Sequence, residues 1–590
     1  MKKEKVKSII SEIELNRNHS WYVELWERNK NSLRDTALFY RETEITYHHM
    51  FRNMRLLASA MRKSGIRKGT EIPVCMSNSP ELIYVMGAAS LLGAKINVFG
   101  AKFPPDYVKE IIDGCDSPIG FFEDNHFAKL RQAVEKSHLN EYILCSLQDS
   151  LKSDLDPNMV QGNEMVCFMS SVSKWKKGND HVVSFSEFLQ RAEGIECQPD
   201  DSITLEDEFS ITYTSGSTNA LRPKAIVQRV RSFCVIGRFH DPDLMYGMKF
   251  KNIRGLAIIP PYSNTDLISS ISDTLMQGAV LTLEPVYDEN FFLDSLLLNR
   301  PNYVIGTRSF WITAMKRCMA VSVKLPFLLL VFAVGEELSI NEEKYLNRML
   351  RKVDAGRDNL HISHSPISFC VAGGDCEHGS ILYRLFRAAT NFSLDPTPEK
   401  RYGMTPFDFV DVAVLDQDGN KLGPNQVGRL VADSPCTMKC YKNDPVGTDA
   451  FFVKDSEGKV WGDMSVYGYI DKRGRVYMRN RIRENTDIPP FQIADEIMKC
   501  KDIMSCEVVK VGERLVAHVE SDPLHNTDIN KAITKAARYC EKKFGSELLG
   551  SLYFRERKGI SSFPLTGSGK RDVKALIDEG ITDLCIKVDK

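Results

Sequence analysis

The fold of this chain is best predicted from residues 71–98, which read EIPVCMSNSPELIYVMGAASLLGAKINV. Residues 71–76 are a short strand-like run, and residues 80–92 carry the apolar pattern of a helix. Residues 93–98, GAKINV, lead from a glycine back into a strand. A strand, a helix and a strand at this spacing form a βαβ unit, which implies a parallel sheet with helices on its faces.

The same alternation of helix and strand recurs elsewhere in the chain. Residues 47–63 carry apolar residues at helical spacing. A helical stretch over residues 266–276 is followed by a strand-like run over 278–283, and another such run spans 302–305. We therefore expect an α/β fold for the larger part of the chain.

The last part of the sequence has a different pattern. Its expected elements are short and closely spaced: a helix near residues 491–499, strands over 507–511 and 515–520, and a helix near 529–544. A chain of 590 residues also exceeds the ~250–300 residues at which single cores stop growing. We predict two domains, a large α/β domain over residues 1–480 and a small α+β domain over residues 481–590.

Composition and charge exclude some classes of function. The chain has 77 Lys and Arg against 78 Asp and Glu, so no charge excess favours nucleic acid. No run reaches the ~18 apolar residues of a membrane-spanning helix, and acidic residues interrupt the N-terminal apolar patch, unlike a signal peptide. The 15 cysteines include no Cys-x-x-Cys pair, which favours reduced thiols. We expect a cytoplasmic protein without a membrane span.

A loop of small hydroxyl residues follows one of the expected strands. Residues 214–219 read TSGSTN, directly after the strand-like residues 209–213, and Lys224 follows. Such a loop can turn successive backbone N–H groups toward one point and bind phosphate oxygens, with the hydroxyls as further donors. It is not a Walker loop, because no Gly-Lys-Ser/Thr opens a helix. Taken alone, this composition is more often an ordinary loop.

Four further motifs accompany this loop in a fixed order. They are Asn78-Ser79-Pro80-Glu81 with Leu92-Gly93-Ala94, Gly335-Glu336-Glu337-Leu338-Ser339, Trp461-Gly462-Asp463 with Gly468-Tyr469-Ile470-Asp471, and Pro564-Leu565-Thr566-Gly567-Ser568-Gly569-Lys570. With residues 214–224, they resemble the motifs of the adenylate-forming superfamily, which includes acyl-CoA synthetases, acyl-AMP ligases and the adenylation domains of peptide synthetases. The resemblance covers nearly the whole chain.

This resemblance implies a large multi-sheet adenylate-forming domain followed by a small, mobile α+β domain. It also implies a ligase that uses ATP and Mg²⁺ to activate a carboxylic acid as an acyl-adenylate. The acyl group would then pass to a thiol, either CoA or the phosphopantetheine of an acyl carrier protein. The expected substrate is a small carboxylic acid of fatty or aryl type.

The resemblance also implies roles for individual residues. Activation brings two anions together, so Lys570 is expected to bridge the attacking carboxylate and the α-phosphate as a compact, flexible positive charge. The expected binding residues are Thr214, Ser215, Gly216, Ser217, Thr218 and Lys224 for the phosphates, Asp463 and Arg481 for the ribose or a phosphate, and Gly335, Gly374, Asp375 and Cys376 for the nucleotide. Arg483 stands at the expected hinge.

A magnesium ion is expected to bridge the phosphates, with a carboxylate in its shell. In the family this carboxylate ends an aromatic-G-x-T-E motif. Residues 373–377, GGDCE, resemble that motif, so Glu377 is the predicted ligand. The rival stretch over residues 402–405, YGMT, matches better locally but ends in Pro406, which cannot bind a metal, and it comes one connection late in the family order.

Several positions depart from the family pattern. Asn219 replaces the last glycine of the phosphate loop, Gly373 offers no ring to stack on adenine, and Arg429 stands where Glu is common. The junction after Arg481 is shorter than in the family, where it lines the thiol channel. Asp266 lies late for contact with a substrate amine, so an α-amino acid is disfavoured as the substrate.

Three interpretations of function are therefore weighed. The preferred one is acyl-adenylate formation followed by transfer to a thiol. A second enzyme interpretation stops at the adenylate or transfers the acyl group to an amine, and it depends on the short junction. The third is a degenerate, non-catalytic nucleotide-binding homologue, which the substitutions at Asn219, Gly373 and Cys376 favour and the intact motif around Lys570 opposes.

Overall fold

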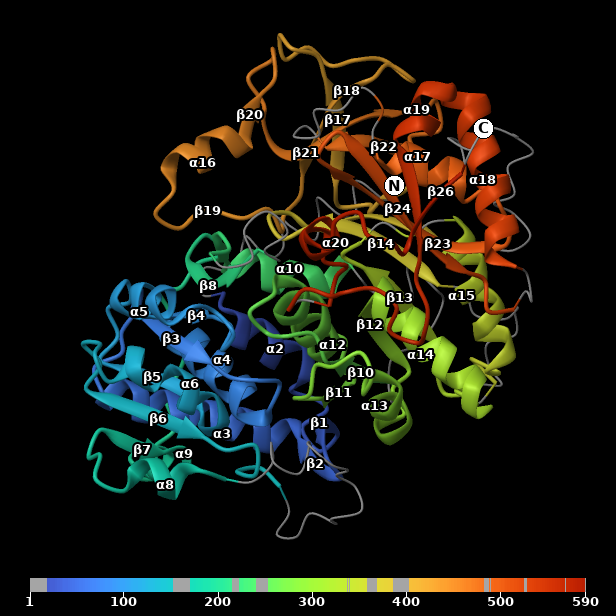
Figure 1. The fold of residues 1–590 in the computed structure, drawn as a ribbon. Coiled ribbons are helices and arrows are strands. Elements are labelled where there is room, and N and C mark those ends of the chain that lie inside the picture. The colour runs from blue at the N-terminus through green and yellow to red at the C-terminus, as the bar shows by residue number, and fades with distance from the viewer. Residues whose placement is uncertain are drawn as a thin grey trace.

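The structure is a computed structural model, and Figure 1 shows its ribbon. It describes residues 19–151, 170–214, 222–239, 253–336, 338, 340–357, 369–385, 403–481, 488, 490–524, 528–567 and 569–588. Within these ranges the strands form four sheets. None of the helices in these ranges is both long and apolar enough to span a membrane.

The predicted βαβ unit lies in an eight-stranded sheet. In sheet order its strands are β19 (Cys440–Tyr441), β9 (Ala225–Arg229), β8 (Glu208–Tyr213), β4 (Lys95–Val98), β3 (Glu71–Cys75), β5 (Ile119–Glu123), β6 (Glu141–Cys145) and β7 (Val182–Ser184). The pairs from β8 to β7 are parallel, whereas β9 runs antiparallel to β8 and β19 antiparallel to β9. The helices joining or following these strands are α4 (Pro80–Leu92), α5 (Pro105–Asp113), α6 (Asp124–Val134), α8 (Val172–Lys176) and α9 (Phe185–Gln190).

Local sequence accounts for the bounds of α4. The hydroxyl of Ser79 accepts the backbone N–H of Leu82, and Pro80 occupies the first helical position. Gly93 ends the helix with a φ of 65°, a left-handed conformation that glycine adopts without strain. Every residue of α4 is buried, because the helix packs against both α2 (Trp21–Asn29) and α3 (Tyr47–Lys63).

The second large sheet has nine strands. In order they are β16 (Thr405–Pro406), β15 (Gly379–Leu385), β14 (Cys370–Asp375), β13 (Leu330–Val334), β12 (Tyr303–Thr307), β10 (Arg254–Ala257), β11 (Val280–Leu283), β1 (Thr36–Tyr40) and β2 (Thr43–Thr46). Neighbouring strands from β14 to β1 pair in parallel. The helices that join its strands are α12 (Asp273–Met276), α13 (Phe292–Asn299), α14 (Arg308–Val321) and α15 (Ile340–Lys352). The helix α10 (Val230–Phe239) precedes β10 and packs against β8 and β9 of the first sheet.

The helix expected over residues 266–276 is present, but its first part is π-helical rather than α-helical. Thr265–Ser272 form a π-helix, η2, which continues as α12. Apolar spacing predicts a helical face but does not distinguish a π-helical turn from an α-helical one. Short π-helical segments are frequent at functional sites.

Two smaller sheets complete the structure. One contains β17 (Asp411–Leu415), β18 (Gly428–Asp433), β21 (Val460–Ile470), β20 (Phe452–Lys454) and β22 (Val476–Arg481), with α16 (Pro445–Phe451) before β20. The other contains β23 (Ile503–Val511), β24 (Arg514–Ser521), β25 (Leu552–Glu556) and β26 (Cys585–Lys587). Its helices are α17 (Pro490–Ile497), α18 (Ile529–Phe544), α19 (Ser546–Ser551) and α20 (Val573–Asp578).

The last sheet and its helices, residues 490–588, are called the C-terminal unit below. They pack around a core cluster of their own, which includes Ile497, Val519 and Phe554. Figure 1 shows this unit lying against α14 and α15. The predicted division between residues 480 and 481 falls at the last residue of β22, before α17, and remains a prediction.

Candidate functional site

The predicted phosphate loop connects two antiparallel strands, β8 and β9. The backbone N–H of Thr214 donates to the carbonyl of Lys224 at 3.0 Å, and the N–H of Lys224 donates to the Thr214 hydroxyl at 3.0 Å. These two bonds close the base of the loop. Ser215, Gly216, Ser217 and Thr218 lie outside the described residues, so their predicted phosphate contacts remain predictions.

Lys224 lies at the base of this loop with its side chain exposed. Its ammonium group lies 3.0 Å from the Asp444 carboxylate and 4.2 Å from the centre of the Tyr441 ring. The ring position is compatible with a cation–π contact. A single exposed ion pair contributes little to stability, so Lys224 can leave Asp444 for a more strongly charged ligand.

Glu377 lies in the hairpin turn between β14 and β15. The hydroxyl of Tyr441 donates to its carboxylate Oε1 at 2.7 Å, and the N–H of Met438 donates to its backbone carbonyl at 2.6 Å. Burial raises the pKa of the Glu377 carboxyl, and the nearby charge of Asp375 adds to this rise. Tyr441 thus connects the predicted metal ligand with the predicted phosphate-binding Lys224.

Asp375 and His378 form a pair in the same turn. The imidazole Nδ1 of His378 lies 2.8 Å from a carboxylate oxygen of Asp375. Burial of His378 lowers the pKa of its imidazole, but the Asp375 charge outweighs this effect and the net pKa is raised. His378 also packs closely on Gly462, because a Cβ there would lie 2.2 Å from its Nε2. The turn is therefore held against the strand that carries Asp463.

Asp463, the predicted ribose-binding residue, lies on β21 with both carboxylate oxygens engaged. Arg429 donates to Oδ2 at 2.7 Å, and the N–H of Ser465 donates to Oδ1 at 2.9 Å. Each carboxylate oxygen can accept more than one hydrogen bond, so this pairing leaves capacity for ribose hydroxyls. The backbone of Arg481 ends β22 and pairs with Val466 of β21.

The loop that carries Lys570 is a tight turn docked against the end of β13. The N–H of Thr566 donates to the carbonyl of Lys570 at 2.7 Å, and the N–H of Lys570 donates to the Thr566 hydroxyl at 3.2 Å. A Cβ on Gly335 would lie 2.9 Å from Cε of Lys570. Glycine is therefore needed at Gly335 for the lysine stem to pass, and its φ of +80° also favours glycine.

A second glycine contact brings the backbone of this loop close to aromatic side chains. A Cβ on Gly569 would lie 2.2 Å from the hydroxyl of Tyr287. The Tyr287 ring stacks on Phe310 of α14, with ring centres 4.6 Å apart. Any side chain in place of Gly569 would displace the loop from this aromatic surface.

Two residues connect the separate parts of the site, and the sequence analysis did not single them out. Tyr262 accepts the N–H of Tyr213, directly before the phosphate loop, at 2.9 Å and donates its hydroxyl to the carbonyl of Gly567 at 3.3 Å. Asn264 contacts the hydroxyl of Thr212 at 3.0 Å and donates to the carbonyl of Cys376 at 2.6 Å. In the sequence, the feature that could have indicated these two residues is the polar stretch that follows Pro260 and Pro261.

The predicted residues thus fall into groups joined by a few connecting residues. Lys570 meets Gly335, and Lys224 meets Glu377 through Tyr441. Gly462, the residue before Asp463, packs against His378 of the His378–Asp375 pair, while Gly374 is exposed in β14. Arg483 lies outside the described residues, and for Arg481 the structure describes only the backbone.

Comparison with known proteins identifies a family for most of the chain. A family model described as AMP-binding enzyme matches residues 25–442. A 4-coumarate-CoA ligase 2 of Narcissus pseudonarcissus is 22% identical over 541 residues, covering 87% of this chain and 84% of the relative. An acetyl-coenzyme A synthetase of Mesorhizobium japonicum is 25% identical over 215 residues, which cover 35% of this chain but only 31% of that relative.

Solved structures share the fold over nearly the full length. An anthranilate CoA ligase, AuaEII, in complex with anthranoyl-AMP matches with a TM-score of 0.71 at 14% identity, covering 95% of this chain and 97% of that one. At this identity the likeness establishes the fold. The predicted α/β fold with several sheets is confirmed.

Proposed function

The chain belongs to the AMP-binding enzyme family, and on that basis we propose that it activates a small carboxylic acid with ATP and transfers the acyl group to a thiol. Family membership confirms the predicted resemblance to adenylate-forming enzymes and the prediction of an AMP-forming ligase. The acid, the acceptor and the roles of individual residues are our proposals.

The observation that carries this proposal is the position of Lys570. Its side chain passes directly over Gly335 at the carboxyl end of β13, and Tyr262 connects its loop to the strand before the phosphate loop. Ligands of open α/β sheets bind outside the carboxyl ends of parallel strands. A cationic side chain that reaches this edge from the C-terminal unit suits a reaction between two anions.

The proposed reaction is an in-line displacement at phosphorus. A carboxylate oxygen of the acid bonds to the α-phosphorus of ATP, and the bond to the bridging oxygen breaks, releasing pyrophosphate. Lys570 reduces the repulsion between the carboxylate and the α-phosphate and stabilises the charge that develops on the phosphate. Lys224 and the loop that begins at Thr214 hold the leaving phosphates, and Asp463 accepts the ribose hydroxyls.

The residues near Glu377 fit the magnesium ion that this family implies. Mg²⁺ usually binds one or two protein carboxylates together with substrate phosphates. Tyr441 holds the Glu377 carboxylate near Lys224, and within the described residues no group of three or more His, Cys, Asp or Glu forms a protein cage. When bound, the ion would neutralise phosphate charge. Glu377 would hold it jointly with the nucleotide.

The proposed substrate is an acid without an α-amino group, and CoA or a carrier-protein phosphopantetheine is the proposed acceptor. Asp266 on η2 is fully buried, and this burial raises the pKa of its carboxyl well above the ordinary value. A carboxyl enclosed by the protein in this way is not exposed to the ammonium group of a substrate. The relatives named above are an acetyl-coenzyme A synthetase and a 4-coumarate-CoA ligase, and these names support a small aliphatic or aryl acid.

The test is pyrophosphate release from Mg-ATP across aliphatic, aryl and amino acids, each with and without CoA. Lys570→Ala is measured beside Lys574→Ala, which removes an exposed lysine of α20 in the same unit. We expect release with one class of acid, a reduction of at least about 100-fold in Lys570→Ala, and no change in Lys574→Ala.

The outcomes separate the interpretations of function. Stimulation by CoA, with an acyl-CoA product, supports transfer to that thiol. An adenylate that accumulates unchanged by CoA or a phosphopantetheinylated carrier protein favours an enzyme that stops at the adenylate or uses an amine. Folded protein that releases no pyrophosphate with any acid would contradict the proposal and favour a non-catalytic homologue.

A further inference from the structure

Arg571, the residue directly after Lys570, belongs to a buried group of charged side chains. The group joins α14, α15 and the end of β13 to the C-terminal unit. It consists of Arg308, Glu336, Glu342, Glu507 and Arg571, and it is called the Arg571 cluster below. The Arg571 side chain is 4% exposed and that of Glu342 is 1% exposed. Buried charges of this kind need close partners.

Arg571 contacts the large body through both its backbone and its side chain. Its N–H donates to Oε1 of Glu336 at 2.7 Å, and its Nη2 donates to Oε1 of Glu342 at 3.1 Å. Glu336 directly follows Gly335, over which the Lys570 stem passes. The residue after the lysine is therefore bound to the residue after the glycine.

Arg571 is also tied to its own unit. Its Nη1 lies 3.4 Å from Oε2 of Glu507, and it donates to the hydroxyl of Ser505, both on β23. Its guanidinium carbon lies 3.7 Å from the centre of the Phe563 ring, in the segment that leads into the loop. These contacts orient the planar guanidinium, which a flexible lysine could not reproduce.

Arg308 pairs with carboxylates of both the large body and the C-terminal unit. It lies at the start of α14, within 3.3–3.7 Å of Glu336, Glu342 and Glu507. The hydroxyl of Ser505 also donates to Glu342 at 2.6 Å. If the C-terminal unit moves away, Glu342 loses its contacts with Arg571 and Ser505 together. These polar groups must then be hydrated before the unit can leave its docked position.

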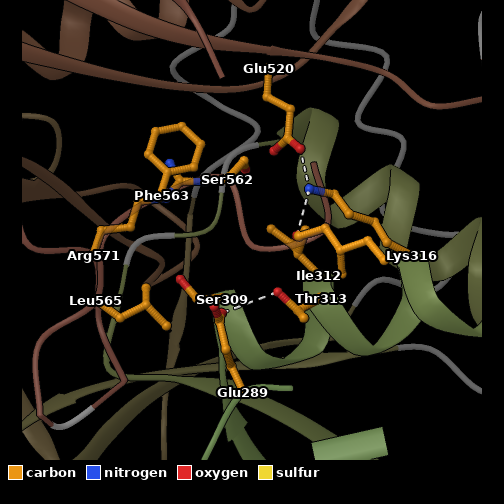
Figure 2. A pocket seen from close by; sticks show the side chains of 11 residues that line it. Glu289, Ser309, Ile312, Thr313, Lys316, Glu520, Ser562, Phe563, Leu565 and Arg571 are labelled. Carbon is orange, nitrogen blue, oxygen red and sulfur yellow. Dashed lines mark hydrogen bonds and ion pairs between the residues drawn. The ribbon is translucent and has the colours of Figure 1, made fainter. Parts of the chain in front are cut away.

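A second ion pair crosses the same contact, next to a small cavity. Figure 2 shows Lys316 of α14 pointing to Glu520 of β24, with Phe563, Leu565 and Arg571 lining the other wall. The cavity has a volume of about 20 Å³, enough for about one water molecule. The segment that leads into the loop therefore faces α14 across this small cavity.

We propose that Arg571 is the positioning residue of Lys570, and that the Arg571 cluster makes docking of the C-terminal unit and placement of Lys570 a single event. The part that concerns adenylate formation depends on the proposed function. The part that concerns the loop's position does not.

The test measures the loop directly and by activity. Arg571→Gln, Arg571→Lys and Glu342→Gln are compared with wild type by hydrogen–deuterium exchange of residues 564–572 in the full chain without ligands. Arg348→Gln is the matched control. Arg348 also pairs across the contact, with Asp522 at 2.8 Å, but it does not contact the loop.

We expect Arg571→Gln and Glu342→Gln to speed exchange in the loop at least tenfold, with Arg571→Lys partly restoring protection. In acid-dependent pyrophosphate release, the same two variants should lower kcat about 10–100-fold, while KM for ATP stays within about threefold, because nucleotide contacts are intact. Arg348→Gln should leave exchange in the loop unchanged.

Unchanged exchange in Arg571→Gln would overturn the proposal, as would an equal increase in Arg348→Gln, since that would reflect general loosening of the contact. A matched rise in KM without a change in kcat would also overturn it. Faster exchange in the loop in a chain whose wild type releases no pyrophosphate would support the positioning and contradict the proposed function instead.

Discussion

The Lys570 loop and the residues proposed to bind the nucleotide, called the nucleotide side below, differ in how deeply their charged side chains are buried. The arginine beside Lys570 has a side chain that is 4% exposed and meets carboxylates from both parts of the chain. The arginine beside Asp463 is 33% exposed and has one carboxylate partner. Removing one side chain from a buried charge network leaves its partners without a counter-charge and destabilises the protein strongly. An exposed ion pair contributes little to stability, so its loss has a small effect. Removing an arginine should therefore have a large effect in the first region and a small effect in the second.

The difference also fits the departures from the family pattern. The glycine-rich loop around Lys570 keeps every motif residue, and Thr566, Gly569 and Lys570 make close contacts in it. On the nucleotide side, Arg429 replaces the usual Glu and donates to Asp463, and Gly373 offers no ring. Lys570 is supplied by the C-terminal unit, so its position depends on the contacts that dock this unit. A surface that binds a nucleotide directly depends less on each neighbouring residue.

The largest expected effect is that of Arg308→Met. The substitution leaves Glu336 and Glu342 buried without their partner on α14, so the free energy of unfolding should fall by about 3–5 kcal/mol. Urea unfolding measures this loss. Arg317→Met on the same helix removes an exposed pair with Asp294 and should cost less than about 1 kcal/mol. An equal loss of unfolding free energy in Arg308→Met and Arg317→Met would contradict the expected difference between buried and exposed ion pairs.

The second effect is on the C-terminal unit and depends on pH. His518 is fully buried on β24, and burial and the charge of Arg557 lower the pKa of its imidazole to about 4. Between about pH 6.5 and this value, the unfolded chain binds more protons than the folded chain, so stability falls as pH falls. The stability advantage of wild type over His518→Gln should shrink by on the order of 2 kcal/mol from pH 7 to 4. A constant difference contradicts this.

On the nucleotide side, Asp463→Ala should have the largest effect. Hydrogen bonds from ribose hydroxyls to a charged group contribute about 1.5–3 kcal/mol, so ATP affinity should fall about 10–100-fold. Calorimetric titration with Mg-ATP measures this without turnover. Asp433→Ala, on the neighbouring strand β18 and exposed, is the control. Equal affinities of Asp463→Ala and wild type would exclude a ribose contact.

A smaller effect is expected for Tyr441→Phe. The substitution removes the hydrogen bond to Glu377, worth about 1 kcal/mol, so about fivefold more Mg²⁺ should be needed for half-maximal pyrophosphate release. Tyr467→Phe, an exposed tyrosine on β21, serves as the control. An unchanged magnesium dependence in Tyr441→Phe would argue against Glu377 as the metal ligand.

The smallest effect is expected for Arg429→Met. Because the pair with Asp463 is partly exposed, its loss should change ATP affinity by less than about fivefold. The same titration measures it. A change of tenfold or more would mean that Arg429 contacts the nucleotide itself, and the nucleotide side would then resemble the Lys570 side.

Much of the fold could be predicted from local pattern. The bounds expected for α3, α4 and α18 agree with the structure, because apolar spacing, Ser79 and Gly93 act over a few neighbouring residues. The π-helical form of η2 could not be predicted, since its apolar face is the same in either helix. The choice of Glu377 over the stretch at residues 402–405 used chain order and remains a prediction; in the structure, Glu377 and Lys224 both contact Tyr441.

The amino-acid sequence by itself determined the family, the α/β pattern and the identity of the motif residues, because these depend on local spacing and on the order of motifs. Only the tertiary structure decided which residues connect them. The contacts of Tyr262, Asn264 and Arg571 cannot be predicted from motif spacing, because their partners lie far away in the chain. Burial creates this dependence, because charges and donors removed from water must find partners wherever the fold supplies them.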